Sequence, residues 1–144
     1  MITWDTFERE IKTLSKKITK KPGAIVAVVR GGLVPARLLA RDLHVRDVYA
    51  ITVRRVGDER KLTVDILEDI RGKHLLVVED MIETGRGLML AKEHLESKGA
   101  IVKTACLYTM PKSEIIPDFY LRTIEEVVRF PWESPRARIE EPNR

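Results

Sequence analysis

The sequence predicts a single-domain α/β fold in which a mostly parallel β-sheet is flanked by helices. Residues 24–29 and 75–78 form two short apolar runs without polar alternation, as is typical of strands buried on both faces of a parallel sheet. Each run leads through a polar, glycine-containing turn into a helical pattern, which is the repeating unit of such sheets. A chain of 144 residues suits one domain of this kind.

Apolar residues at helical spacing predict three helices. The first covers about residues 4–20, with Thr3 or Asp5 as its N-cap and one face formed by Phe7, Ile11, Leu14 and Ile18. The second covers residues 33–43 and carries a proline near its first turn, where proline is tolerated. The third covers residues 88–98 and ends at Gly99, a residue type that favours helix C-termini.

The remaining segments are predicted as strands, a loop and a tail. Strands are expected at residues 48–53 and 101–108, with a weaker alternating pattern at 62–67. Residues 54–61 show no apolar pattern and are interpreted as a loop. The domain is expected to span residues 1–133, followed by a charged, proline-containing C-terminal tail at 134–144.

Composition narrows the class of protein. The net charge is +4, but the basic residues are not interleaved with aromatic ones, so nucleic-acid binding is not the favoured interpretation. No apolar run approaches the roughly 18 residues of a membrane span and no signal sequence opens the chain, so no membrane association and a cytoplasmic location are expected. The single cysteine, Cys106, lies in an apolar run and is interpreted as a core residue.

The segment Leu75 to Leu88 (LLVVEDMIETGRGL) carries the clearest chemical pattern. Two adjacent acids follow the apolar strand, and a Thr-Gly turn then leads into a helix. Glycines at positions 85 and 87 allow positive φ and close approach of a ligand to the backbone. The Thr84 hydroxyl, successive N–H groups and the helix N-terminus all favour an anion. The turn is therefore predicted to be a phosphate cradle.

The two acids, Glu79 and Asp80, would repel a phosphate, so they are expected to contact another part of the ligand. Carboxylates suit hydroxyl donors or a hydrated Mg²⁺, which takes oxygen ligands. No His/Cys cluster has the spacing of a metal site, so the expected metal is Mg²⁺ arriving with the substrate. A ligand with a phosphate at one end and vicinal hydroxyls beside it is a phosphorylated ribose.

A second turn, Arg30-Gly31-Gly32, follows the first apolar strand. Two glycines make a tight turn with accessible N–H groups, and the arginine adds one guanidinium. Together these groups suit a diphosphate. Ligands of open α/β sheets bind beyond the carboxyl ends of the strands, so both turns are expected at one site.

Together these segments resemble the type I phosphoribosyltransferases, which use 5-phosphoribosyl-1-pyrophosphate (PRPP). The run at 75–88 is similar to their PRPP signature, and VVRGGLVPARLLARDL is similar to their pyrophosphate loop and following helix. The resemblance implies their fold, with a small C-terminal hood, and transfer of the phosphoribosyl group from PRPP to a nucleobase with release of pyrophosphate.

The resemblance also implies which residues bind each part of PRPP. Glu79 and Asp80 hold the ribose hydroxyls, and Asp80 also contacts Mg²⁺. The 5′-phosphate is held by Ile82, Glu83, Thr84, Gly85, Arg86 and Gly87, and the pyrophosphate by Arg30, Gly31 and Gly32.

Three residues are predicted to act in catalysis. In the related 6-oxopurine enzymes, an aspartate at the position of Glu83 faces ring nitrogen N7 of the base as a proton acceptor. A mobile loop in the family closes over PRPP, and residues 54–61 correspond to it. The resemblance therefore implies that Arg54 and Arg55 reach the leaving pyrophosphate; an ordinary solvated hairpin loop is the alternative.

Residues 116–133 resemble the base-binding region of small bacterial and archaeal xanthine/guanine/hypoxanthine enzymes. Those enzymes have a lysine where this chain has Met110, and an aromatic residue where it has Val127. The backbone of Val128 is predicted to read the base edge. Lys112 either replaces the missing lysine or is a solvated loop residue.

The favoured function is a purine phosphoribosyltransferase of purine salvage, using hypoxanthine, guanine or xanthine. The substitutions at Met110 and Val127 leave two alternatives open: an adenine-type enzyme on the same fold, or a non-catalytic regulator that senses PRPP or a nucleotide. The resemblance further implies a homodimer or homotetramer.

Overall fold

The computed structural model describes residues 1–133; the predicted tail at 134–144 lies outside them. Its main sheet has five strands in the order β3-β2-β1-β4-β6. All neighbouring strands are parallel except β2 and β3, which form an antiparallel hairpin. The strands are β1 (Ala24–Val29), β2 (Val48–Val56), β3 (Glu59–Val64), β4 (His74–Val78) and β6 (Ile101–Ala105). The predicted α/β class is therefore confirmed.

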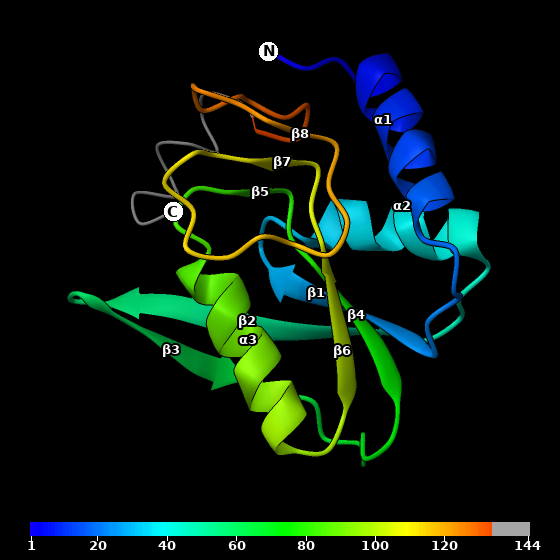
Figure 1. The fold of residues 1–144 in the computed structure, drawn as a ribbon, viewed down its shortest axis with the longest axis vertical. Coiled ribbons are helices and arrows are strands. Elements are labelled where there is room, and N and C mark those ends of the chain that lie inside the picture. Colours follow the sequence, from blue (N-terminus) through cyan, green and yellow to red (C-terminus); the bar gives the residue numbers. More distant parts are fainter. Residues whose placement is uncertain (134–144) are drawn as a thin grey trace.

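Three helices cover the two faces of this sheet (Figure 1): α1 (Trp4–Lys17), α2 (Leu33–Leu43) and α3 (Arg86–Ser97). Side chains of β1 and β4 alternate between two cores. Ile25 and Leu76 pack with α1 and α2, whereas Val26 and Leu75 pack with α3. Both faces are buried, which explains why these strands read as continuous apolar runs.

A second, small sheet lies over the carboxyl-end edge of the main sheet and forms the predicted hood (Figure 1). Its parallel strands are β5 (Met81–Ile82), β7 (Tyr108–Thr109) and β8 (Arg122–Thr123). The single strand predicted for residues 101–108 is wrong, because the chain leaves the main sheet after Ala105 and pairs with β5 from Tyr108 onwards. Cys106 at this step is fully buried, as predicted.

Aromatic side chains attach the hood to α1. Phe130 stacks between Tyr108 and Trp132, at centroid distances of 5.8 and 4.8 Å. Trp132 also packs edge-on against Phe7 at 4.9 Å. The Tyr108 hydroxyl donates a hydrogen bond to Glu10 of α1. Arg122 of β8 also pairs with Glu10, at 2.8 Å, so apolar burial and polar contacts together fix the hood to the body of the domain.

Two helix boundaries differ from the predicted ones. α1 ends at Lys17, and Ile18 is its C-cap, so the predicted last turn is absent. α3 begins at Arg86, two residues before the predicted start, which places Gly87 inside the helix. At its other end, Gly99 has φ +90°, and the N–H groups of Gly99 and Ala100 bond back to Glu96 and Leu95, a pattern that ends helices.

The loop predicted at residues 54–61 is wrong. β2 and β3 continue through this region as a hairpin, and only Gly57 and Asp58 form the turn. Gly57 has φ +63°, which a tight hairpin turn of this kind requires. The prediction relied on an alternating apolar pattern. Both faces of β2 and β3 are exposed near the turn, so these strands have polar residues there and show no such pattern.

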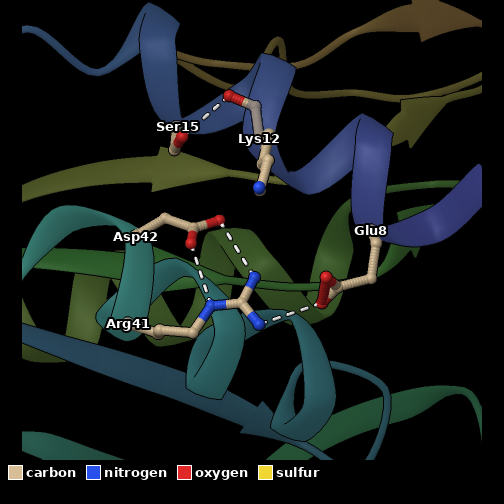
Figure 2. Close-up of polar contacts among 5 residues, drawn as sticks. All are labelled: Glu8, Lys12, Ser15, Arg41 and Asp42. Atoms are coloured by element: carbon tan, nitrogen blue, oxygen red, sulfur yellow. Dashed lines mark hydrogen bonds and ion pairs between the residues drawn. The ribbon is translucent and has the colours of Figure 1, made fainter. Parts of the chain in front are cut away.

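A polar cluster joins α1 and α2 on the surface (Figure 2). The Arg41 guanidinium lies between two carboxylates, 3.0 Å from Glu8 and 2.9 Å from Asp42. Hydrogen bonds to Asp42 and Glu8 raise the pKa of Arg41 further above its already high ordinary value. About two-fifths of the Arg41 and Glu8 side chains is exposed, so this cluster contributes at most about 1 kcal/mol to stability.

Asp65, the residue after β3, joins the open end of the hairpin to α3. Its carboxylate accepts hydrogen bonds from His94, at 2.8 Å, and from Lys98. Burial alone would raise the pKa of Asp65, but the hydrogen bonds from Lys98 and His94 outweigh it and lower the pKa below the ordinary 3.8. The ionised carboxylate therefore stabilises the fold.

Asp65→Asn is expected to lower the free energy of unfolding by about 1–2 kcal/mol at pH 7. Because the folded pKa is depressed, the contribution is fully present above the unfolded pKa of Asp65 and is lost as the pH falls through the folded pKa. Urea unfolding at pH 7 and at pH values below 3.8 measures this. Asp47→Asn is the matched control, since Asp47 is exposed and takes no part in this contact. A wild-type advantage that grows on acidification would contradict the account.

Candidate functional site

The two predicted ligand turns meet at the carboxyl ends of β1 and β4. These strands are parallel neighbours, with Ala27 in register with Val78. The Arg30-Gly31-Gly32 turn therefore lies beside Glu79 and Asp80. A Cβ on Gly31 would be 2.6 and 2.8 Å from the two carboxylate oxygens of Asp80. A Cβ on Gly32 would approach the Val78 carbonyl oxygen well inside 3.0 Å. Both glycines are thus needed for close packing.

The adjacent acids differ in their surroundings. Asp80 is only 2% exposed, and its Oδ1 accepts a hydrogen bond from the Met81 N–H at 2.6 Å. Glu79 is half-buried, with its N–H bonded to the Ala105 carbonyl. Asp80 therefore borders the pyrophosphate-loop candidate, while Glu79 is the more accessible of the two. Their predicted contacts with ribose stay predictions.

Two of the three described helices begin at this edge, and neither is capped by the side chain of its N-cap residue; at α3 the Arg86 N–H donates a long hydrogen bond of 3.4 Å to the Thr84 hydroxyl. The N-cap residues of α2 and α3 are Gly32 and Gly85, and neither first turn contains an acid. By contrast α1, which begins elsewhere, is capped by the Thr3 hydroxyl and carries Asp5 in its first turn. Uncapped helix N-termini attract anions through their N–H groups and dipole. The site offers two such ends.

The phosphate cradle (residues 82–87) is fitted closely against the hood loop (residues 110–115). Gly85 has φ +77°, and a Cβ there would overlap the Ile115 side chain. The N–H groups of Met110 and Glu114 donate to the carbonyls of Ile82 and Thr84, at 3.1 and 2.8 Å. Gly87, in contrast, is helical and has no positive φ, so that part of the prediction is wrong.

Two ion pairs join the cradle to the hood loop. Lys112 Nζ lies 3.6 Å from Glu83 Oε2, which brings together the predicted base-binding lysine and the predicted proton acceptor. Arg86 contacts Glu114, with Nη2 3.0 Å from Oε1. All four side chains are about half-exposed. A hydrogen bond from Arg86 lowers the pKa of Glu114, with Arg60 of β3 adding a smaller electrostatic effect.

The other predicted base-binding residues also belong to the hood. Met110 is partly buried at the start of the hood loop. Val127 is 48% exposed, whereas Val128 packs against the core shared with α1 and α2. The two valines follow Ile124, whose N–H donates a hydrogen bond to the Thr109 carbonyl of β7. Their contact with a base stays a prediction.

The predicted pyrophosphate arginines lie on the hairpin. Arg54 is opposite Lys61 and Arg55 is opposite Arg60, so like charges face one another across the strands. Arg55 Nε donates to the Gly57 carbonyl at 3.1 Å. The Arg60 side chain reaches the start of α3, since its Cδ would be 3.8 Å from a Cβ on Gly87. The hairpin is therefore a neighbour of the cradle.

Three further observations on residues 1–133 concern metal binding, membrane spans and a second cleft. No group of three or more His, Cys, Asp or Glu side chains in this range is arranged to hold a metal ion without further ligands. None of its helices has the length and apolarity needed to cross a membrane. A cleft of about 480 Å³, lined by Lys20, Lys21, Lys73 and His74 among others, lies at the amino ends of β1 and β4, away from the candidate site.

Sequence reasoning missed three residues of the hood loop. Ser113, Glu114 and Ile115 contact Gly85 or Arg86 across the cradle. They lie 28 residues or more after the residues that they contact, and local pattern does not report such pairing. The sequence offered one indication of these contacts, namely the charged residues Lys112 and Glu114 after Pro111.

Comparison with known proteins agrees with this geometry. The sequence model of the phosphoribosyl transferase domain matches residues 3–137. The chain is 27% identical to the xanthine-guanine phosphoribosyltransferase of Chromohalobacter salexigens, covering 96% of this chain and 86% of that protein.

Solved structures give the same result. The purine phosphoribosyltransferase of Pyrococcus horikoshii matches with 33% identity and a TM-score of 0.87, covering 92% of each chain. The xanthine-guanine-hypoxanthine enzyme of Helicobacter pylori shares the fold, with 23% identity, a TM-score of 0.81 and 96% of each chain covered. The chain belongs to the phosphoribosyl transferase family.

Proposed function

We propose that this protein transfers the 5-phosphoribosyl group of PRPP to a 6-oxopurine base, forming a nucleoside 5′-monophosphate and pyrophosphate in purine salvage. The observation that carries the proposal is the pair of uncapped helices, α2 and α3, that begin at one edge of the sheet beside two acids. The curated relatives named xanthine-guanine phosphoribosyltransferases support the same substrates.

In this proposal the two phosphate ends of PRPP bind at the two helix N-termini. The 5′-phosphate binds at the cradle, to the Thr84 hydroxyl and backbone N–H groups at the start of α3. The pyrophosphate binds at Arg30, Gly31 and Gly32 before α2. The distance between the ends is then set by β1 and β4, two rigid neighbouring strands. Fixed N–H donors of this kind stabilise charge that develops on the leaving pyrophosphate.

Glu79 and Asp80 are proposed to orient the ribose between these ends. Carboxylate oxygens accept hydrogen bonds from vicinal hydroxyls and also suit Mg²⁺, so these residues fit the ion expected with PRPP. Asp80 borders the pyrophosphate loop and is the proposed protein ligand. When bound, Mg²⁺ would neutralise the charge of the leaving pyrophosphate.

The ion pair between Glu83 and Lys112 is proposed to bind one edge of the base. It presents one acceptor and one donor 3.6 Å apart. A 6-oxopurine protonated at N7 presents the complementary donor, N7–H, beside the acceptor O6. Adenine carries an amino group in place of O6 and would leave the Lys112 ammonium without an acceptor, which is costly.

The reaction then follows from these contacts. Base nitrogen N9 forms a bond to ribose C1′ while the bond from C1′ to the pyrophosphate oxygen breaks. The bond to N9 makes the N7–H group acidic, and Glu83 accepts the N7 proton. Arg54 and Arg55 are proposed to approach the leaving group from the hairpin, in addition to Arg30 at the loop.

Lys112→Gln is expected to lower kcat/KM for hypoxanthine by about 10- to 100-fold, because a hydrogen bond from a charged donor to O6 is lost. The value for adenine should change little. Lys21→Gln is the matched control, since Lys21 is exposed at the opposite end of the sheet. Equal losses for both bases, or no loss, would show that Lys112 does not select the base.

The proposed activity is tested by pyrophosphate release from PRPP with Mg²⁺, measured separately with hypoxanthine, guanine, xanthine, adenine and uracil. Turnover with one or more 6-oxopurines is the expected result. Turnover with adenine alone would favour the adenine-type alternative. Turnover with none, while PRPP raises the unfolding temperature, would favour a regulator that binds PRPP without reaction.

Assembly and location are further proposals. The resemblance favours a homodimer or homotetramer in the cytoplasm. Light scattering coupled to size-exclusion chromatography measures the mass in solution. A monomer at assay concentration would overturn the proposed assembly without affecting the proposed reaction.

A further inference from the structure

The hood loop and the phosphate cradle form one closely packed unit. The Glu114 N–H donates to the Thr84 carbonyl at 2.8 Å, and the Ile115 side chain fills the space left by the missing Cβ of Gly85. Glu114 is therefore held beside the cradle by its own backbone. Its half-exposed carboxylate can change rotamer without movement of the hood loop.

Arg86 is the only cationic residue of the cradle sequence, and Glu114 binds it. Nη2 is 3.0 Å from Oε1, and Nε is 3.2 and 3.4 Å from the two carboxylate oxygens. This is a two-pronged contact between a guanidinium and a planar anion, the arrangement that arginine also uses for phosphate. A phosphate at the cradle would need the same guanidinium.

The helix end itself has no anion of its own. α3 has a glycine N-cap and no acid in its first turn, so the Glu114 carboxylate supplies negative charge there from outside the helix. A phosphate monoester carries about two negative charges at neutral pH and would be repelled by that carboxylate. The two anions therefore exclude one another.

We propose that Glu114 is an internal competitor for the phosphate cradle: it holds Arg86 in the ligand-free protein and leaves when a substrate phosphate binds. The inference rests on the proposed function, in that the 5′-phosphate is taken to bind at residues 82–87. It adds a residue that lowers phosphate affinity and keeps Arg86 in a fixed position before the substrate arrives.

Release of Glu114 also affects the part of the hood loop that is proposed to bind the nucleobase. The same hood loop carries Lys112, which pairs with Glu83. The charges alternate: Glu83 of the cradle faces Lys112 of the loop, and Arg86 of the cradle faces Glu114 of the loop. Release of Glu114 by phosphate removes one of these two pairs, whereas the Lys112–Glu83 pair and the backbone hydrogen bonds of Met110 and Glu114 remain. Phosphate binding thereby removes one side-chain restraint from the segment that presents Lys112 to the base.

The test measures binding of ribose 5-phosphate by calorimetry to the full-length protein. Glu114→Gln keeps the size of the side chain and removes its charge, and it is expected to bind ribose 5-phosphate about 2- to 5-fold more tightly than the wild type. The size of this change follows from the modest strength of an exposed ion pair. Surface substitutions of this kind change folding stability little, and thermal unfolding checks that.

Two further variants identify the cause. Glu96→Gln removes the same charge about 15 Å along the exposed face of α3 and should leave binding unchanged. In an Arg86→Gln background, Glu114→Gln should give a clearly smaller gain than in the wild type, because the competed guanidinium is gone. A full gain in that background would overturn competition for Arg86.

The outcomes separate the inference from the proposed function. If ribose 5-phosphate binds the wild type but Glu114→Gln does not bind it more tightly, the inference fails and the proposed function stands. If neither protein binds ribose 5-phosphate or PRPP, the proposed function fails and the inference fails with it.

Discussion

Gly32→Ala is expected to destabilise the fold by about 3 kcal/mol or more. A Cβ at this position would lie well inside 3.0 Å of the Val78 carbonyl oxygen, and 2.9 Å from the backbone N and O of Val28. These atoms belong to the central strands β1 and β4, so they cannot give way as a flexible side chain can. Urea unfolding monitored by tryptophan fluorescence measures the loss.

Gly87→Ala is the matched control for this substitution. Gly87 lies in α3, and its added Cβ would meet side chains only at 3.7 and 3.8 Å, which is ordinary contact. Alanine favours the helix, so a gain of about 0.5–1 kcal/mol is expected. A Gly32→Ala protein as stable as the wild type would show that the turn after β1 can move away from β4. The proposed pyrophosphate site would then lose its fixed position.

Glu83→Gln is expected to lower kcat by about 100-fold or more with the preferred base. Glutamine keeps the size and a hydrogen-bond acceptor but cannot take the N7 proton. Glu83 is exposed, so the variant should unfold at nearly the same temperature as the wild type. Steady-state rates with saturating PRPP and base measure the effect.

Binding of PRPP separates this chemical effect from damage to the cradle. Glu83 lies within residues 82–87, but its carboxylate lies 3.6 Å from the Lys112 ammonium of the hood loop. The Kd for PRPP is therefore expected to change less than about 5-fold. A large loss of PRPP affinity with little change in kcat would contradict the assignment of Glu83 as proton acceptor.

The sheet and both ligand turns could be predicted because they depend on local pattern. Continuous apolar runs identified β1 and β4, and parallel strands that are neighbours bring the turns after them together. The positive φ of Gly85 was predicted from residue type, whereas Gly87 was misjudged because helix α3 begins two residues earlier. A glycine inside the first helical turn has the same local sequence signal as one before it.

The hairpin and the hood could not be read in the same way. Arg54 and Arg55 lie in β2 although charged residues seldom indicate a strand, because backbone pairing with β3 and not burial extends the sheet there. The pairs that join the cradle to the hood, Glu83 with Lys112 and Arg86 with Glu114, depend on the parallel pairing of β5 with β7, which brings the segments after these strands together. Spacing along the sequence carries no information about such contacts.

If one site joins PRPP to a purine base, the nucleotide and pyrophosphate form in a fixed molar ratio, and that ratio is the decisive measurement. Purified protein, PRPP, Mg²⁺ and hypoxanthine are incubated, and inosine monophosphate and pyrophosphate are quantified by chromatography in the same sample. Equal molar amounts of the two products are expected, each dependent on both substrates. Pyrophosphate released without nucleotide, or neither product although guanine and xanthine are also supplied, would contradict this expectation.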